Sequence, residues 1–403
     1  MSYQSSIVFP NEKPTVSAII THAYALGMLL ALASCGRNSP SASGVSYQHD
    51  EVPAVPWSIH VAKIDRVRSD LELRSTLARG TVEGLSTLVQ QVRELPPAAG
   101  QPIAAINGDF YVVDEKNPYL GDPRGLQILD GELVSAPTDQ ASFWIDAAGQ
   151  LQATNVLSQL KVTWADGTST PIGLNEERRE GAAVLYTPRH GASTKTKGGR
   201  ELILEPAGSG SFLPLQAGRE ISARVRSSRE EGNSALSEAV LILSLSRVLF
   251  TNAALAAQAV EGAVLKISTA TIPDLAGVKM AISGGFVLLR DGRKQEIRTP
   301  KSDAYKYRSV GERHPRAAIG ASREHIFLVE VDGRQPELSM GMTLDELGGY
   351  MQRLGCELAL SLDGGASATF WYQGKVMNSP CNGADRPIAN GIVVAAKPAV
   401  KRP

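Results

Sequence analysis

Short apolar runs that stop at polar residues and glycine dominate this chain. Residues 57–67 (WSIHVAKIDRV) alternate apolar and polar side chains, which predicts a β-strand. Further apolar runs separated by glycine- and aspartate-containing turns lie at 160–164, 182–186, 201–204 and 239–245. They predict a β-rich middle segment over residues 150–275.

Two segments have apolar residues at helical spacing. Thr81 is a candidate N-cap for a helix that runs to Leu95, where two prolines stop it. Thr343 and Glu346 form the pattern of a capping box. The helix that follows carries Leu344, Leu347, Met351 and Leu354 on one face, and Gly355 is suited to end it.

The order of elements predicts the fold class. Apolar runs at 326–331 and 358–362 flank the capped helix, and strand, helix, strand in this order indicates a local crossover unit. Strands outnumber helices elsewhere. The prediction is therefore an α+β fold with a strand-rich mixed sheet and flanking helices, in one large domain over residues 57–397.

The N-terminus has the layout of an export signal. Residues 23–33 (AYALGMLLALA) are too short an apolar run to span a bilayer and suit a signal peptide. The following Leu-Ala-Ser-Cys resembles the lipobox of bacterial lipoproteins, so residues 1–35 are predicted to be a lipoprotein-type signal with Cys35 as the lipidated residue. A plain secretory signal and a core helix are the alternatives.

Residues 36–56 are rich in Ser, Pro and Gly, which predicts a flexible tether. Gly36 stands where an Asp usually signals inner-membrane retention. The expected location is thus the bacterial cell envelope, lipid-anchored on the periplasmic side of the outer membrane where the cell has one, with secretion as the alternative.

Composition excludes one class of function. Lys+Arg and Asp+Glu both total 41 in 403 residues, and a zero net charge argues against a nucleic-acid binder. After Cys35 only Cys356 and Cys381 remain, at no metal-ligand spacing. A disulfide and two free thiols both stay open for this pair.

Four apolar runs end in a polar residue next to glycine. Each alone is ordinary turn chemistry, but glycine also lets a ligand approach bare backbone. If the four ends gather, they form a pocket with carboxylates at Asp109, Asp332 and Asp363. No cofactor is required, although these carboxylates also suit Ca²⁺ or another divalent cation. The four ends are Asn107-Gly108-Asp109, Ser283-Gly284-Gly285, Asp332-Gly333-Arg334 and Asp363-Gly364-Gly365.

Two basic segments add candidate chemistry. Residues 313–316 (Arg-His-Pro-Arg) form a compact cationic cluster, and arginine presents a planar fork matched to phosphate or carboxylate. A solvated surface loop is the equal alternative. Residues 187–200 are polar and basic and predict a long loop, either functional or disordered.

These residues together resemble the phosphodiester glycosidase family, the bacterial relatives of the lysosomal uncovering enzyme. The parts that carry the motifs are 103–125 and 279–394. The matching blocks are AINGDFY (105–111), SGGFVLLRDG (283–292), RHPRAAIG (313–320), VDGRQPELSMGMTLDEL (331–347), LSLDGGASATF (360–370), VMNSP (376–380) and RPIANGIVV (386–394).

The resemblance implies hydrolysis of the bond between an anomeric carbon and a phosphate oxygen in a sugar-1-phosphodiester. Asp363 is the first candidate to stabilise or attack the glycosyl cation, and Asp109 the second. Asp332 is expected to orient an arginine or bind sugar, and His314 to act with the phosphate-binding arginines Arg313, Arg316 and Arg334. Asn107 and Asn378 are expected at sugar hydroxyls, Ser283 and Ser367 at phosphate, and Gly284, Gly285, Gly364 and Gly365 at the pocket floor.

Two departures from the family pattern leave alternatives open. Ala366 stands where the family has a third glycine, and Ala317 where it often has a hydroxyl. These favour, as an alternative, a non-catalytic glycan-binding envelope lipoprotein. A structural envelope protein that uses the domain for protein contacts is the third hypothesis. The expected partner is a carbohydrate, with membrane contact only through the lipid anchor.

Overall fold

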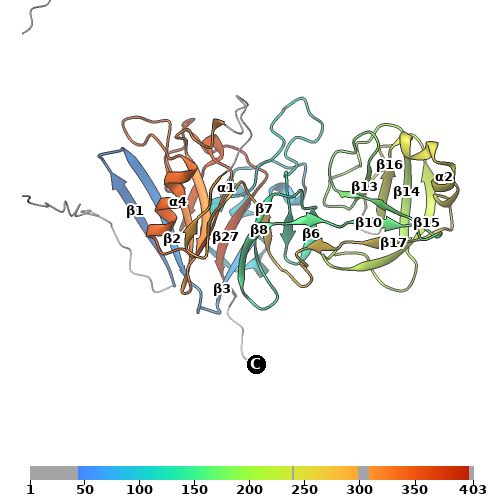
Figure 1. Cartoon of the computed structure of the whole chain (residues 1–403), viewed down its shortest axis with the longest axis horizontal. Helices are drawn as coiled ribbons and strands as arrows, with labels where there is room; N and C mark the ends of the chain where they lie inside the picture. Colours follow the sequence, from blue (N-terminus) through green and yellow to red (C-terminus); the bar gives the residue numbers. More distant parts are fainter. Residues whose placement is uncertain (1–43, 238–239, 298–307, 399–403) are drawn as a thin grey trace, which may run out of the picture. The chain divides into compact units, whose positions relative to one another are not determined.

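The computed structural model describes residues 44–237, 240–297 and 308–398 (Figure 1). The predicted signal peptide, Cys35 and the first part of the tether lie outside these residues. Within the part of the chain described, no helix is long and apolar enough to cross a membrane.

A seven-stranded sheet carries most of the motif-bearing strands. Every pairing in it is antiparallel. Its strand order is β1 (Val45–Val52), β2 (Trp57–Asp65), β23 (His325–Val331), β22 (Arg316–Ala321), β24 (Leu358–Ser361), β20 (Val287–Arg290) and β21 (Arg293–Lys294).

The tether prediction is wrong from residue 45 onward. β1 pairs with β2 along its whole length, from Val45 opposite Ile64 to Val52 opposite Trp57. Residues 53–56 form the turn of this hairpin. The prolines that suggested a tether therefore belong to a tight turn, and the alternating residues before it form an edge strand.

The predicted crossover unit is present. β23 and β24 both run antiparallel to β22 and are therefore parallel to each other, with α4 (Leu344–Arg353) between them in the chain. The capping box of Thr343 and Glu346 is formed, and Gly355 ends the helix with φ of +82°. A Cβ at Gly320 would collide with Cε of Met351, so this glycine lets α4 lie close against the sheet.

Two five-stranded sheets complete this part of the molecule. One has the order β26 (Lys375–Val376), β25 (Phe370–Tyr372), β4 (Gln101–Asn107), β27 (Asn390–Ala396) and β3 (Leu71–Leu77). The other has the order β6 (Glu132–Ser135), β5 (Gln127–Leu129), β19 (Ala281–Ser283), β7 (Ala141–Ile145) and β8 (Leu151–Asn155). One apolar core cluster joins residues of all three sheets, including Ile319, Ile392 and Phe143.

The helix predicted from Thr81 is shorter than expected. α1 spans Leu88–Arg93, and Thr87 caps it by accepting from the Gln90 backbone N–H. The backbone N–H of Val82 donates instead to the Arg189 carbonyl, and Ser86 pairs with Ile388. Tertiary hydrogen bonds therefore hold residues 81–86 in non-helical conformation.

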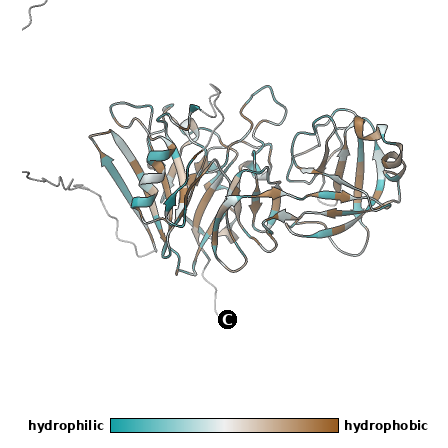
Figure 2. Ribbon diagram, viewed as in Figure 1, coloured by the Kyte–Doolittle hydropathy of each residue, from teal (hydrophilic) through white to brown (hydrophobic). Residues whose placement is uncertain are grey.

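The β-rich middle segment forms an eight-stranded sheet, and its core cluster also includes Ile128, Leu133 and Trp144 of the neighbouring five-stranded sheet. Its strands carry buried apolar residues, and Figure 2 shows hydrophobic positions along them. α2 (Ala253–Gln258) and the strand pair β9 (Leu157–Ser158) and β18 (Thr271–Ile272) accompany it. The order is β11 (Ser169–Pro171), β10 (Lys161–Thr163), β17 (Val264–Ser268), β15 (Glu220–Arg229), β14 (Arg200–Pro206), β16 (Leu241–Leu245), β13 (Ala183–Tyr186) and β12 (Gly173–Leu174).

The described residues contain three α-helices among many strands, so the α+β description fits. Among the described residues, the one parallel pairing is that of β12 with β13, in the eight-stranded sheet. That the motif-bearing parts and the middle segment form a single domain stays a prediction.

The basic segment 187–200 is held by ion pairs. Arg189 Nη2 lies 2.7 Å from a Glu132 carboxylate oxygen, and Lys195 Nζ lies 2.7 Å from Glu83. His190 is fully buried beside Glu83. Of the two alternatives left open for this segment, disorder is excluded.

Candidate active site

Two of the predicted strand ends meet through backbone hydrogen bonds. β4 ends at Asn107 and β24 at Ser361. The Asp363 N–H donates to the Gly108 carbonyl over 2.9 Å, and the Asn107 amide donates to the Asp363 carbonyl over 2.7 Å. Asp109 and Asp363 therefore stand on adjacent turns.

The end of β19 joins them. The Gly285 N–H donates to the Ser361 carbonyl over 2.8 Å. A Cβ at Gly284 would collide with that carbonyl, and one at Gly285 would lie 3.4 Å from the Phe110 ring. These glycines are needed because three turns pack against one another here.

The fourth strand end arrives through the Arg-His-Pro-Arg segment. The Gly365 N–H donates to the Pro315 carbonyl over 2.9 Å. A Cβ at Gly333 would lie 2.6 Å from the Pro315 nitrogen, and a Cβ at Gly365 would lie 3.1 Å from a nitrogen of the Arg334 guanidinium. The backbone of all four turns thus gathers around Asp363–Gly365, as the sequence predicted.

Asp109 is a buried carboxyl with an unsatisfied oxygen. Its Oδ1 accepts from the Phe110 N–H over 2.7 Å, and its Oδ2 has no hydrogen-bond partner. The Asp109 N–H donates to Oδ1 of Asn390 over 2.8 Å. Burial raises the pKa of Asp109 well above its usual value, and the nearby Asp363 charge raises it further.

Asp363 is partly exposed and less strongly perturbed. Burial raises its pKa to about 6, while Ser367, the Gly364 N–H and the Arg386 charge act in the opposite direction. The Gly364 N–H donates to Asp363 Oδ1 over 2.8 Å. The Ser367 hydroxyl is buried near this carboxyl without a hydrogen bond of good geometry.

Burial therefore raises the pKa of both carboxyls, that of Asp109 well above its usual value and that of Asp363 to about 6. Paired carboxyls with separated pKa values are the arrangement that glycosidases use to divide acid and nucleophile roles.

Two arginines lie beside the Asp363 turn. The exposed Arg334 guanidinium sits against Gly365, with Nε and Nη2 each 3.4 Å from His314 Nδ1. Arg386 lies over the Tyr111 ring at 5.6 Å, and its charge lowers the pKa of both Tyr111 and Asp363. These are the guanidinium groups placed to bind an anion at the turn.

The Arg-His-Pro-Arg cluster is divided by the structure. Arg313 points to the capping box, where its Nε lies 3.1 Å from Glu346 Oε2. His314 pairs with Glu312 at 3.1 Å, and burial, Arg316 and Arg334 lower its pKa. Of the four side chains, His314 contacts Arg334.

Arg316 is a positioning residue in this structure. Its side chain is buried, and it donates to the Met342 carbonyl over 2.7 Å, to Ser309 over 2.6 Å and to Glu312 over 2.8 Å. These bonds fix the segment that carries His314. We infer this role in place of the phosphate contact expected from the sequence.

Replacing Arg316 with alanine should lower the free energy of unfolding by about 2–4 kcal/mol, because three backbone carbonyls lose a charged donor in a buried site. Urea denaturation measures this loss. A lysine variant should recover little, since one ammonium cannot span the three carbonyls. Wild-type stability in the alanine variant would show that these bonds contribute nothing.

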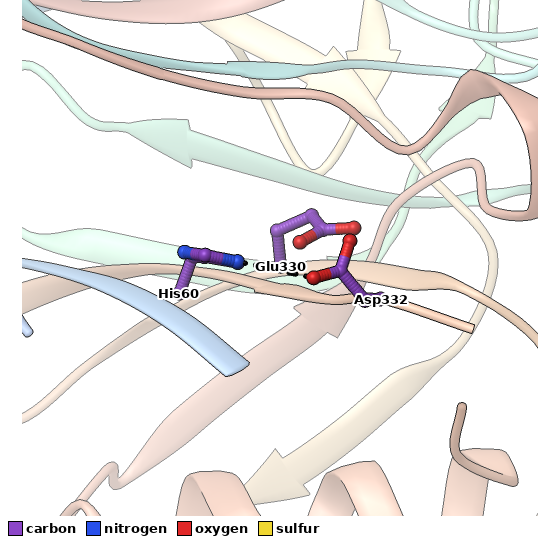
Figure 3. A group of neighbouring side chains, drawn as sticks. All are labelled: His60, Glu330 and Asp332. Atoms are coloured by element: carbon purple, nitrogen blue, oxygen red, sulfur yellow. Dashed lines mark hydrogen bonds and ion pairs between the residues drawn. The ribbon is translucent and has the colours of Figure 1, made fainter. Parts of the chain in front are cut away.

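Asp332 belongs to a second acidic group, apart from the Asp109–Asp363 pair. It is buried and accepts from the Ser58 hydroxyl over 2.8 Å and from the Ser379 N–H over 2.7 Å. His60 Nε2 lies 3.2 Å from its Oδ2, and Glu330 points toward it (Figure 3). Asp109, Asp332 and Asp363, the carboxylates that also suit Ca²⁺, do not form one group of ligand atoms among the described residues. Among the described residues, one group of three potential metal-ligand side chains has ligand atoms that all lie within 4.8 Å of one another. This group consists of His60, Glu330 and Asp332.

Several predicted binding residues have internal partners. Asn107 is fully buried and accepts from the Thr369 N–H, and Asn378 bridges the Phe370 N–H and Glu330. The Ser283 hydroxyl accepts from the Leu126 N–H and pairs with Ser142. These three side chains position the turns and, in this conformation, face no open space for a sugar or phosphate.

Five residues near the two groups were not singled out from the sequence. Arg386 and Asn390 lie in RPIANGIVV, and Tyr111 in AINGDFY, so the family blocks contained the signal. His60 lies in an alternating strand and Glu330 before Asp332, where nothing in the local pattern distinguished either from an ordinary strand residue.

The two departures from the family pattern cause no strain. The positive φ required by the turn falls on Gly365 (+63°), whereas Ala366 lies in a short 3-10 turn. The Ala317 methyl packs in the apolar core. Neither alanine disturbs the carboxyls, which weakens the case for a degenerate site.

The two cysteines are free thiols. Cys356 is buried, and burial raises the pKa of its thiol to about 12, so it is unreactive. The disulfide alternative for Cys356 and Cys381 does not apply in this structure.

Comparison with known proteins gives a family match for part of the chain. Residues 220–395 match the family model of phosphodiester glycosidases. The match begins at β15 in the middle segment and includes Asp332, Asp363 and Asn390, while Asp109 lies before it. No curated protein matches the chain.

Three solved structures are similar to the chain. A hypothetical protein from Synechocystis has a TM-score of 0.70 and 20% identity over 89% of this chain, which spans 63% of that protein's length. A candidate exported protein from Burkholderia pseudomallei K96243 has a TM-score of 0.64 and 21% identity, covering 84% and 74% of the two chains. The zebrafish N-acetylglucosamine-1-phosphodiester α-N-acetylglucosaminidase catalytic domain, auto-inhibited by its pro-peptide, has a TM-score of 0.45 and 15% identity, covering 87% and 82%.

Proposed function

We propose that the protein hydrolyses the glycosidic bond of a sugar-1-phosphodiester in an envelope or extracellular glycan. The observation that carries this proposal is the pair of carboxyls Asp109 and Asp363, on adjacent turns with separated pKa values, beside two arginines. The family of residues 220–395 supports the same reaction class.

The chemistry follows from the charges. Ionised Asp363 stabilises or attacks the anomeric carbon as the bond to the phosphate oxygen breaks. The phosphate monoester leaves as an anion that Arg386 and Arg334 stabilise, so a strong acid is not required. The raised pKa of Asp109 favours its acid form, which would donate a proton to the leaving phosphate oxygen and regain one from the water that attacks the anomeric carbon.

The sugar would lie against Phe110. Its side chain is 37% exposed although it follows the buried Asp109 directly, and its ring borders Gly285. An exposed aromatic ring next to the carboxyls provides an apolar face for a pyranose. The substrate ring would then sit above the glycine-lined turns.

We place the protein in the cell envelope, held by a lipid on Cys35. The export signal in the sequence supports this, together with the structurally similar Burkholderia protein described as exported. Secretion without a lipid is the alternative, and globomycin-sensitive processing in a bacterial host separates the two.

The decisive experiment incubates the purified protein with a panel of synthetic sugar-1-phosphodiesters and follows release of free sugar and phosphate monoester. Turnover of at least one member supports the proposal. Binding of the panel without product would favour the alternative, a glycan-binding envelope protein. Neither binding nor product with any member would contradict both functions.

A further inference from the structure

The group formed by His60, Glu330 and Asp332 has the properties of a metal site. The three side chains are 3%, 0% and 1% exposed. His60 Nε2 and Asp332 Oδ2 lie 3.2 Å apart, close to the ~3.4 Å edge of a tetrahedron with ligand bonds of about 2.0–2.2 Å. The three ligand atoms all lie within 4.8 Å of one another.

Glu330 supplies an independent sign that a ligand is missing. Its Oε1 accepts from the Asn378 amide over 3.2 Å, while its Oε2 is buried with no hydrogen-bond partner. Figure 3 shows its carboxyl pointing toward that of Asp332. A fully buried carboxylate oxygen without a partner is costly unless a proton or a cation neutralises it.

Charge balance points the same way. Within the described residues, neither Glu330 nor Asp332 is ion-paired to lysine or arginine, and His60 is the one basic side chain paired with either. Two carboxylates with one imidazole carry a net negative charge in a buried site.

The groups around the cluster orient the candidate ligands. His60 Nδ1 lies 2.8 Å from the Tyr47 hydroxyl, which leaves Nε2 facing Asp332. The Ser58 hydroxyl and the Ser379 N–H both donate to the Asp332 carboxylate. His49 Nε2 lies 2.9 Å from the Ser58 hydroxyl oxygen. Metal-binding histidines and carboxylates are usually fixed by second hydrogen bonds of this kind.

We propose that His60, Glu330 and Asp332 bind one divalent transition-metal ion of the zinc class. Imidazole nitrogen favours zinc over calcium, which takes six to eight oxygen ligands. The Ser379 N–H donates to Asp332 Oδ1 over 2.7 Å, which brings the segment of Ser379 to Cys381, with its partly exposed thiol, to this group. The ion would tie β2 and the end of β23 to this segment. The inference does not depend on the proposed glycosidase activity.

The test uses the full chain, stripped with chelator, dialysed against Zn²⁺ and then against metal-free buffer. Elemental analysis should find about one zinc per chain, and zinc should raise the melting temperature of the stripped protein by several degrees. Co²⁺ loading should give visible d–d absorption, and loss of a near-ultraviolet charge-transfer band in Cys381→Ser would identify the thiol as fourth ligand.

Glu330→Gln keeps the side-chain shape and should reduce bound zinc at least tenfold. Asp122→Asn is the matched control, because Asp122 is a buried carboxyl with an unpartnered oxygen outside this group, and it should keep the full zinc content. Folded wild-type protein that holds less than a tenth of an equivalent and shows no melting shift with Zn²⁺ would overturn the proposal. A proton shared by Glu330 and Asp332 would then neutralise the site.

Discussion

Asp363→Asn should fold and lose about 10³-fold or more of kcat/KM on a sugar-1-phosphodiester. The asparagine keeps the shape and can still accept from the Gly364 N–H, but it carries no charge to face the glycosyl cation. In the wild-type protein kcat/KM should fall as pH drops through the Asp363 pKa of about 6, since protonation removes the same charge.

The same substitution should have the opposite effect on stability. A carboxyl whose pKa is raised on folding binds protons more tightly in the folded state. The contribution of Asp363 to wild-type stability should therefore fall as pH rises from about 4 to about 6 and stay level above. The asparagine variant lacks this loss. It should be more stable than wild type by on the order of 1 kcal/mol at pH 7, with no difference below pH 4, after allowance for the partial exposure of Asp363.

Asp146→Asn provides the control. Asp146 lies in an exposed turn, where it accepts from the Ala148 and Gln150 N–H groups, and its loss should leave turnover unchanged. Activity is read as released phosphate monoester, and stability as urea denaturation across pH. An Asp363→Asn enzyme with near wild-type turnover would remove Asp363 from the mechanism, whatever its stability.

The convergence of the four glycine-containing turns could be predicted from the sequence, because the signals for it lie in neighbouring residues. Glycine after a strand end marks a position where backbone must pack closely, and Gly108, Gly285 and Gly365 meet that condition. The capping box at Thr343 and Glu346 was likewise readable, since it depends on residues three apart.

The direction of each side chain could not be predicted in the same way. Asp332 and Asp363 both follow a strand and precede glycine, yet Asp332 turns to His60, more than 270 residues away in the chain. Which carboxyl faces which partner depends on the order of strands in the sheet, and the sequence did not determine that β2 and β23 would be neighbours.

For the middle segment, too, the sequence predicted the strands but not how they pair. Its strands were predicted from apolar runs, but their pairing into one sheet joins residues such as Lys161 and Ser268 across a hundred positions. The helix from Thr81 failed for the same reason, because long-range bonds to Arg189 and Ile388 outweigh local propensity.

Arg386→Ala should lower kcat/KM for a sugar-1-phosphodiester by about 10²-fold, the usual effect of removing one group that stabilises a developing anion. A neutral aryl glycoside should lose much less, because its leaving group does not bring a phosphate charge to the arginine. Because Arg386 also lowers the pKa of Asp363, the acid limb of the pH profile should move to higher pH in the variant.

Arg353→Ala is the matched control. Arg353 lies over the Tyr350 ring at 5.5 Å, much as Arg386 lies over Tyr111, but it is on α4. A purely structural role for Arg386 predicts equal losses on both substrates and an unmoved pH profile. That result would leave Arg334 as the guanidinium placed to hold the leaving phosphate, because it sits exposed against Gly365.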